Sequence, residues 1–309
     1  VRLAGSGAVN ASRYVTFAEI DHAANICLTD SYIDGTYNCG VFRECKYIHR
    51  ARNLVGPERV NDVWSNVISG GGLTGNLDLS AGRVHECVNE IVLPQSASFL
   101  AFWGADGHSD YHQIGAADDP VADYEYLMLK NYAVNEQCLF TSSTFRDDVN
   151  GVRGWIVGNF FASHNSHGIT PGPVISGDTL IIAKNTVIKH NDTPEAAAGS
   201  YSGASLEGQI RVSDDNGQSP GTIIIRDNVM CRLVGPSGQL ATDDSQVDTP
   251  PTLWGSTGIP VTATGNAYVD MVNASGPAEM IAAFAGTDVS GAGFFTSSDS
   301  NATRGMWTP

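Results

Sequence analysis

The chain has 309 residues, of which 42% are apolar, and its formal net charge is −16 because 33 acidic residues face 17 basic ones. A field of this sign repels phosphate backbones and anionic lipid surfaces, so we expect neither nucleic acid nor a membrane as a partner. No stretch approaches the roughly 20 apolar residues that a membrane-spanning helix needs.

A loose internal repeat is the main structural feature of the sequence. Each copy has a β-rich run, then Lys, Gly or Asp, then Asn, then a second short β-rich run. Five clear copies lie, in chain order, at 126–135 (YLMLKNYAVN), 154–163 (GWIVGNFFAS), 180–189 (LIIAKNTVIK), 223–232 (IIIRDNVMCR) and 261–270 (VTATGNAYVD). Weaker copies lie earlier, at 49–55 (HRARNLV) and 85–92 (HECVNEIV).

The spacing of these copies indicates coils. Their Asn residues are 28, 26, 43 and 38 positions apart, which fits one coil of a solenoid with loops inserted in the longer coils. An Asn tolerates the left-handed backbone region that a tight bend needs, and stacked Asn side chains can form a hydrogen-bonded ladder. The repeat therefore predicts an all-β fold, a right-handed parallel β-helix over residues 1–275. An antiparallel sandwich is the alternative, disfavoured because Asn-Gly hairpin turns between matched strands are few.

The end of the chain and the cysteines complete the structural expectations. Residues 277–285 (PAEMIAAFA) predict a short helix, so we assign 276–309 to a helix and tail that close the coil stack. None of the six cysteines belongs to a C-x-x-C pair. We expect most of them to be reduced thiols, with Cys87, Cys138 and Cys231 in the core. Cys39 and Cys45 are the pair most suited to a disulfide bond.

Residues 104–115 (GADGHSDYHQIG), followed by YLMLKN and GWIVGNFF, resemble the pectate-lyase-type superfamily of right-handed parallel β-helices. The matching residues are His108, Asp110, Gln113, Asn131 and Asn159. The resemblance covers about 78–191 and is one of fold. The superfamily includes polysaccharide lyases, glycoside hydrolases, epimerases, phage tailspikes and non-catalytic binders, so it implies extracellular polysaccharide as the ligand without fixing a reaction.

Two histidine-rich segments are candidates for catalysis. In an extended strand, alternation puts His108, Asp110 and His112 on one face, where a histidine can act as a general base near neutral pH. The coil spacing predicts that His164 and His167 lie on the same side of the β-helix. Polar side chains that only hydrogen-bond within loops are the alternative in both segments.

Charged and aromatic residues near these segments could hold a sugar chain. Arg146 and Arg153 could neutralise a uronate carboxylate, although a solvated loop is the favoured explanation. We assign catalysis to His108, Asp110, His112, Arg146 and His167, and substrate binding to Trp103, Tyr111, Gln113, Arg153 and His164. We expect no cofactor, and calcium is the one metal that the four Asp-Asp pairs could hold, although none has the spacing of a calcium loop.

Three functions follow from these expectations. The first is a tailspike-like virion protein that binds, and could cleave, an extracellular polysaccharide. The second is a secreted bacterial polysaccharide lyase. The third is a non-catalytic structural β-helix protein of a virion or cell surface. A virion or extracellular location suits all three, and a homotrimer or a contact with other virion proteins suits the first and the third.

Overall fold

The computed structural model describes residues 2–4, 16–21, 24–35, 38–43, 45–56, 63–68, 83–93, 110–116, 124–135, 137–141, 152–163, 168–171, 174, 177–189, 209–212, 221–235, 240–248 and 261–268. These residues form short strands and the helix α3 (Ser245–Asp248). No helix in this part of the chain has the length and apolar content to cross a membrane.

The described strands belong to three sheets, here named A, B and C. Sheet C contains, in spatial order, β3 (Asn25–Thr29), β6 (Tyr47–Ala51), β9 (Arg83–Val88), β12 (Tyr124–Leu129), β15 (Val152–Val157), β18 (Thr179–Ala183), β21 (Thr222–Arg226) and β25 (Val261–Thr264). Sheet A contains β1 (Arg2–Ala4), β4 (Tyr32–Asp34), β7 (Leu54–Val55), β10 (Ile91–Val92), β13 (Tyr132–Asn135), β16 (Phe160–Ser163), β19 (Thr186–Lys189), β22 (Val229–Met230) and β26 (Ala267–Tyr268). Sheet B contains β2 (Thr16–Asp21), β5 (Asn38–Arg43), β8 (Trp64–Ile68), β11 (Asp110–Ala116), β14 (Gln137–Thr141), β17 (Ile169–Thr170), β20 (Gln209–Arg211), β23 (Arg232–Val234) and β24 (Leu240–Ala241).

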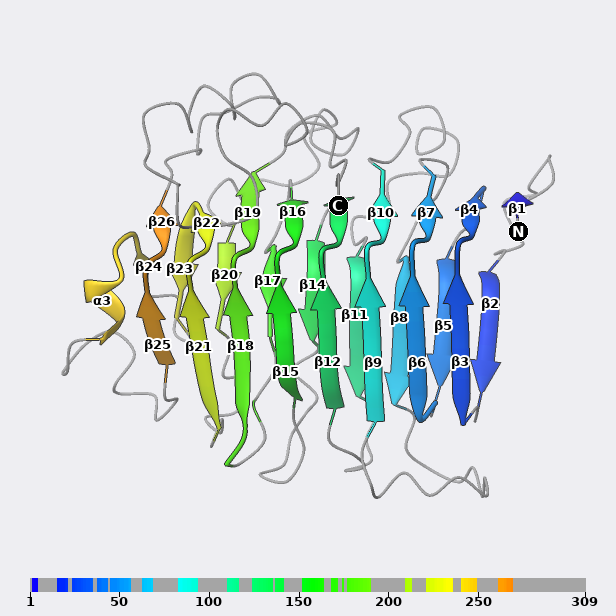
Figure 1. Cartoon of the computed structure of the whole chain (residues 1–309), viewed down its shortest axis with the longest axis horizontal. Coiled ribbons are helices and arrows are strands. Elements are labelled where there is room, and N and C mark those ends of the chain that lie inside the picture. The colour runs from blue at the N-terminus through cyan, green and yellow to red at the C-terminus, as the bar shows by residue number, and fades with distance from the viewer. Residues whose placement is uncertain are drawn as a thin grey trace.

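The chain winds through the sheets in the order C, A, B, once per coil. In Figure 1 the strands of sheet C run upward in front, sheet A continues at the top, sheet B runs downward behind, and successive coils advance from right to left. This path is right-handed. Neighbouring strands pair in parallel, for example Tyr126 with Gly154, and the exception is the antiparallel pair of β23 and β24. The predicted right-handed parallel β-helix is confirmed, and the antiparallel sandwich is excluded.

Inward-facing side chains stack in columns along the axis. One column on sheet C contains Arg50, Cys87, Met128, Ile156, Ile182, Ile225 and Ala263, all buried and in register. From Met128 onward the column is apolar, and each large aliphatic side chain contributes about 1.5–3 kcal/mol by leaving water. The two residues before it are Arg50 and Cys87, which follow Leu28, so this column contains one polar stretch between aliphatic residues.

The bend between sheets C and A repeats in every coil. The residue before each Asn adopts the left-handed region, with φ of 56° at Lys130, 68° at Gly158 and 56° at Lys184. The prediction that the Asn itself adopts this conformation is therefore wrong. The Asn has a different task, since its side chain points into the coil and binds the neighbouring bends.

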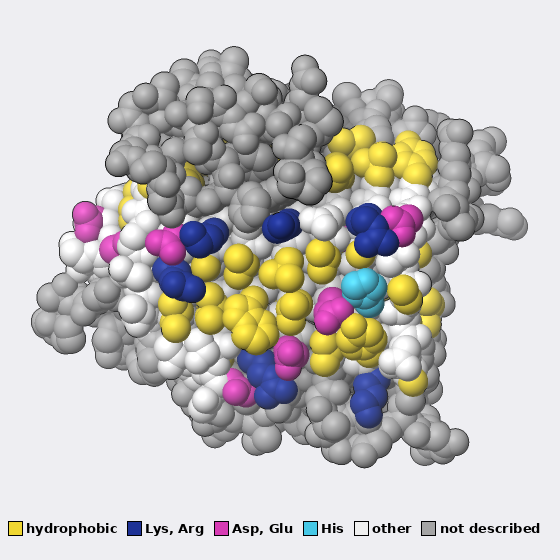
Figure 2. Space-filling model, viewed as in Figure 1, with side chains coloured by type: hydrophobic (Ala, Val, Ile, Leu, Met, Phe, Trp, Pro, Cys, Tyr) yellow, Lys and Arg dark blue, Asp and Glu magenta, His cyan; other side chains and the backbone are white. Residues whose placement is uncertain are grey.

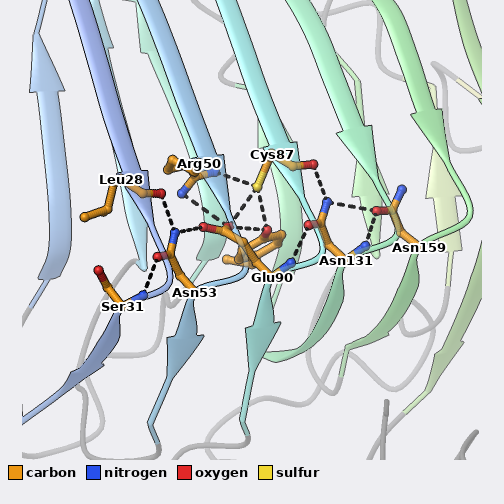
Figure 3. Close-up of polar contacts among 9 residues, drawn as sticks. Leu28, Ser31, Arg50, Asn53, Cys87, Glu90, Asn131 and Asn159 are labelled. Carbon is orange, nitrogen blue, oxygen red and sulfur yellow. Dashed lines mark hydrogen bonds and ion pairs between the residues drawn. The ribbon is translucent and has the colours of Figure 1, made fainter. Parts of the chain in front are cut away.

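These inward Asn side chains form the predicted ladder (Figure 3). The Oδ1 of Asn159 accepts hydrogen bonds from the backbone N–H of Asn131 at 2.9 Å and from its Nδ2 at 3.0 Å. The Nδ2 of Asn159 donates to the carbonyl of Met128 at 2.9 Å and to Oδ1 of Asn185 at 2.9 Å. Each side chain thus satisfies backbone groups at a buried bend that would otherwise lack partners.

The ladder has a defined end at the last described coil. The carboxylate of Asp244 accepts hydrogen bonds from the backbone N–H of Asn266 at 2.9 Å and from its Nδ2 at 2.8 Å. Asp244 directly precedes α3, which packs on β25, and the antiparallel β24 borders sheet B on the same side. Residues 240–248 therefore cover this end of the stack, while the predicted helix and tail at 276–309 lie outside the described residues.

Five described cysteines are reduced. Cys87 and Cys231 are buried, as predicted, whereas the side chain of Cys138 lies outside the described set. Cys39 and Cys45 do not form the disulfide bond considered above. The thiol of Cys45 instead donates to the carbonyl of Ile20 in the neighbouring coil, at 3.4 Å.

Replacing Asn159 by Ala should lower the free energy of unfolding by about 3 kcal/mol or more, because it leaves several buried donors and acceptors without partners at about 1–3 kcal/mol each. Asn266→Ala should cost about 1 kcal/mol, because the side chain of Asn266 is only partly buried and water can replace its contacts. Denaturant unfolding followed by circular dichroism measures both. Equal losses in the two variants would contradict the role assigned to the ladder.

Candidate functional site

Many of the residues assigned from the sequence fall outside the described part of the chain. These are Trp103, His108, Arg146, His164 and His167, together with the side chains of Asp110 and Gln113 in β11. His108 lies between β10 and β11, and His164 and His167 lie between β16 and β17, so both segments connect sheet A to sheet B. That the two clusters share one side of the β-helix stays a prediction.

Tyr111 and His112 lie inside the coil. Both side chains are 0% exposed. The Tyr111 hydroxyl donates to Glu90 at 2.7 Å, and the His112 ring packs edge-on against His85 with centroids 4.6 Å apart. Substrate binding by Tyr111 and catalysis by His112 both require contact with a ligand on the surface, and neither side chain reaches it.

Glu90 replaces Asn in the ladder of this coil. In the weak copy at 85–92, Asn89 takes the left-handed position, with φ of 55°, and Glu90 takes the inward position. The Oε1 of Glu90 accepts from Nδ2 of Asn53 at 2.8 Å, and its backbone N–H donates to Oδ1 of Asn131 at 3.0 Å. The carboxylate therefore keeps the ladder continuous.

The other carboxylate oxygen of Glu90 faces a closed polar cluster (Figure 3). It accepts hydrogen bonds from the Cys87 thiol at 2.8 Å and from the Tyr111 hydroxyl, and the Arg50 guanidinium lies 3.7 Å away. Burial raises the pKa of Cys87 and of Tyr111 well above their usual values, so both stay protonated. Burial acts to lower the pKa of Arg50, but the negative electrostatic potential of the Cys87 sulfur and of the Glu90 carboxylate outweighs it, and that pKa is raised. The cluster is thus a buried ion pair with neutral donors, sealed from ligands.

Removing one member of the Arg50–Glu90 pair should leave an uncompensated buried charge. We expect Arg50→Met and Glu90→Gln each to lower the free energy of unfolding by about 3–5 kcal/mol. The double variant should lose less than either single variant, because no buried charge remains. A double-mutant cycle from denaturant unfolding measures this coupling, and losses that simply add would show that the pair does not act as a unit.

Two buried histidines make stability depend on pH. Burial lowers the pKa of His85 well below 6.5, helped by the charges of His112 and Arg50, and burial also lowers the pKa of His112. Both rings are therefore neutral in the folded protein at pH 6.5, whereas in the unfolded chain they take up protons below about 6.5.

The free energy of unfolding should accordingly have its full value above pH 6.5 and fall as the pH decreases below 6.5. Two protons bound only by the unfolded chain give a limiting slope of about 2.7 kcal/mol per pH unit. His112→Phe should remove about half of that slope. Denaturant midpoints between pH 5 and 7.5 test this, and a flat profile for the parent protein would refute it.

The outer face of sheet C is the most distinctive described surface. Strand alternation turns every second side chain outward. Four outward residues in adjacent strands are in register and form what we call the apolar row: Leu127, Trp155, Ile181 and Ile224. Trp155 is 45% exposed, and Figure 2 shows a continuous apolar patch in the middle of this face. Large exposed apolar patches mark binding surfaces.

Arg153 borders the apolar row, two residues before Trp155 on the same strand. Its guanidinium binds Asp178 at 3.1 Å and Glu125 at 3.2 Å. The hydrogen bond to Asp178 is the main cause that raises the pKa of Arg153. Arg153 is thus the one residue assigned from the sequence whose described side chain lies on the outer surface, and both of its anionic partners come from its own chain.

A line of cations follows the opposite border of the row, at the bend into sheet A. Arg52, Lys130 and Lys184 are exposed and adopt the left-handed conformation, with φ of 55°, 56° and 56°. We call them the cation ridge. They occupy every second coil, with Asn89 and Gly158 between them, so they are about 10 Å apart. Figure 2 shows Lys and Arg side chains along this border.

The N-terminal part of the same face is polar. Cys27, His49 and Glu86 are outward register partners on β3, β6 and β9. His49 Nδ1 lies 2.8 Å from Glu86 Oε2, and the Tyr47 hydroxyl donates to the same oxygen at 2.6 Å. That hydrogen bond raises the pKa of Tyr47 to about 12.

Sequence reasoning missed this face because exposed aliphatic residues look like core residues in a β-rich run. The aligned repeat copies do contain the information. Counting back from each Asn places Leu127, Trp155, Ile181 and Ile224 in one column, and alternation separates that column from the inward one.

No family model, curated protein or solved structure matches this chain. Within the described ranges, no group of three or more His, Cys, Asp or Glu side chains is placed to hold a metal ion. The one Asp-Asp pair among them serves the fold, since Asp243 binds the N–H of Ser245 at 2.7 Å and Asp244 caps the ladder.

Proposed function

We propose that the outer face of sheet C binds an acidic extracellular polysaccharide. The observation that carries the proposal is the parallel course of the apolar row and the cation ridge along the axis. An aromatic ring such as Trp155 offers an apolar platform for the face of a sugar ring, and neighbouring polar groups fix its orientation. A ridge of cations beside it suits carboxylates carried along one side of a polymer.

The charge distribution favours a polyanion at this place. The protein as a whole repels polyanions, with a net charge of −16. Between Asp30, the first bend position, and Asp227, the one before Gly265, the bend positions carry only cations or neutral residues. Arg52 is paired with Asp30 at 2.6 Å, and Lys130 and Lys184 directly follow β12 and β18, the strands of Leu127 and Ile181. These two lysines are therefore the main candidates to meet the ligand.

The backbone conformation of these lysines supports a functional reason for their presence. A residue with a side chain pays about 1–2 kcal/mol in the left-handed region, which Gly avoids. Gly158 and Gly265 hold the equivalent place in other coils. Strained positions that keep a charge instead of Gly are typical of functional sites.

The resemblance of residues 104–115 to the pectate-lyase-type superfamily fits this proposal. We place a tailspike-like virion protein first, and a secreted polysaccharide lyase, which residues 104–115 also suit, is the alternative. A homotrimer that buries the apolar row is the second candidate use of this face, because three members of the row, Leu127, Ile181 and Ile224, are aliphatic.

Trp155→Ala should weaken binding to acidic polysaccharides at least tenfold, since stacking of one ring on a sugar is lost. Affinity electrophoresis through gels that contain an acidic or a neutral polysaccharide measures the effect. Leu240→Ala is the matched control, because Leu240 is 48% exposed but lies on β24. The Lys130→Asn/Lys184→Asn double variant should bind the polyanion less tightly and with weaker salt dependence, because two cations are removed. It should nevertheless melt at a higher temperature, because Asn adopts the left-handed backbone conformation more readily than Lys.

The outcomes separate the candidates. Arg232→Gln, which removes a cation from sheet B, should leave binding unchanged. Binding that no variant alters would refute the proposal.

An assay for unsaturated uronate or new reducing ends shows whether the bound polymer is cleaved. Sedimentation of the parent and of Trp155→Ala tests the homotrimer, which predicts that only the variant dissociates.

A further inference from the structure

The polar end of the sheet C face holds an ordered row of a thiol, an imidazole and a carboxylate. Cys27 is the exposed member of the five described cysteines, whereas the other four are buried. Its register partner is His49 on the adjacent parallel strand, and the register partner of His49 on the far side is Glu86. Adjacent strands are about 4.8 Å apart, so the three side chains stand next to one another on one surface.

The hydrogen bond between His49 and Glu86 defines the state of the imidazole. An ionised carboxylate only accepts, so Nδ1 carries the proton that it donates to Glu86. In the neutral ring the other nitrogen, Nε2, then has a lone pair and can accept a proton. Tyr47 donates to the same carboxylate, which fixes Glu86 in place. The order along the row is therefore nucleophile, base, orienting carboxylate.

The charges around Cys27 include a cation. The sulfur of Cys27 interacts electrostatically with Arg52 and with Tyr47, so both groups lie near it. Arg52 is bound to Asp30, so its field at the sulfur is partly balanced. His49 is the group in the row that can take the thiol proton.

We infer that Cys27, His49 and Glu86 form a nucleophilic site that accepts an acyl group from a carboxylic ester. This site continues the outward line of the apolar row, since Glu86 is the register partner of Leu127, and Arg52 of the cation ridge lies near it. Its chemistry does not depend on the proposed polysaccharide. Cys27 and His49 are the catalytic residues, and Glu86 is a positioning residue.

The reaction balances without a further reagent. Nε2 of His49 takes the proton of the Cys27 thiol, and Sγ attacks the ester carbonyl carbon. The tetrahedral intermediate collapses to a thioester on Cys27, and the alcohol leaves with the proton from His49. Water, deprotonated by His49, then attacks the thioester carbonyl, which releases the carboxylic acid and returns the thiol.

Acetyl transfer from p-nitrophenyl acetate tests the site. The folded protein is mixed with the ester at pH 7.5, quenched in acid, and mapped by peptide mass spectrometry. We expect acetylation of Cys27 and none of Cys39, Cys45, Cys87 or Cys231. The Cys27→Ser variant should lose the adduct. His49→Gln should slow acetylation about tenfold or more, since the variant has no base beside Cys27 to take the thiol proton. Glu86→Gln should slow it less.

A displaced thiol is the matched control. Thr262 is exposed and belongs to the same outward line of sheet C, where its register partner is Ile224 and not a histidine. The Cys27→Ser/Thr262→Cys variant therefore carries one exposed thiol on the same kind of strand without a base. It should react about as slowly as His49→Gln. Equal acetylation rates for the parent and this variant, or a His49→Gln variant as fast as the parent, would overturn the inference. Melting temperatures equal to that of the parent exclude unfolding as the cause of a slower rate.

Discussion

The hydrogen-bonded ladder at the bend between sheets C and A is the constraint on which the rest of the structure depends. Each ladder side chain must meet the bend of the neighbouring coil, so every coil returns to the same phase whatever its length. Successive ladder positions are between 22 and 43 residues apart, yet the contacts between them keep lengths of about 3 Å. Insertions are therefore confined to the other connections, and the strands of sheet C stay in register.

The same constraint explains why one coil can tolerate charge in its interior. Glu90 serves as an acceptor at the ladder position but cannot donate as an Asn does, and its longer side chain reaches into the core. The Arg50 guanidinium, with the Cys87 thiol and the Tyr111 hydroxyl, compensates the carboxylate. A polar cluster of this kind fixes which coil sits where, because an aliphatic neighbour would leave the charge unpaired.

The Asn repeat was sufficient to predict the fold, the ladder and the length of several coils. The repeat did not predict which of two neighbouring residues takes the left-handed position and which points inward. Asn89 and Glu90 are the example, because a one-residue shift leaves the pattern of the sequence almost unchanged. His112 was assigned to the site because strand alternation groups it with His108 and Asp110, and Tyr111 because an aromatic ring can stack on a sugar. Their buried partners, such as Glu90 for Tyr111, lie in another coil and cannot be found by local reasoning. Arg153 was assigned to substrate binding with a solvated loop as the alternative, but it lies in the strand β15, and its partners Glu125 and Asp178 come from neighbouring coils.

A stack of coils in fixed register converts a sequence column into a line on the surface. Residues such as Trp155 and Ile181, which are distant in the sequence, become neighbours at the strand spacing, and every outward column becomes a line parallel to the axis. A ligand that matches such a surface must itself be extended and regular, because a compact ligand meets only one or two coils. The cations at alternate coils add a second period of about 10 Å to that line. An acidic polymer with a repeating unit meets both requirements, and this is the physical reason to prefer it over a small molecule as the partner of this face.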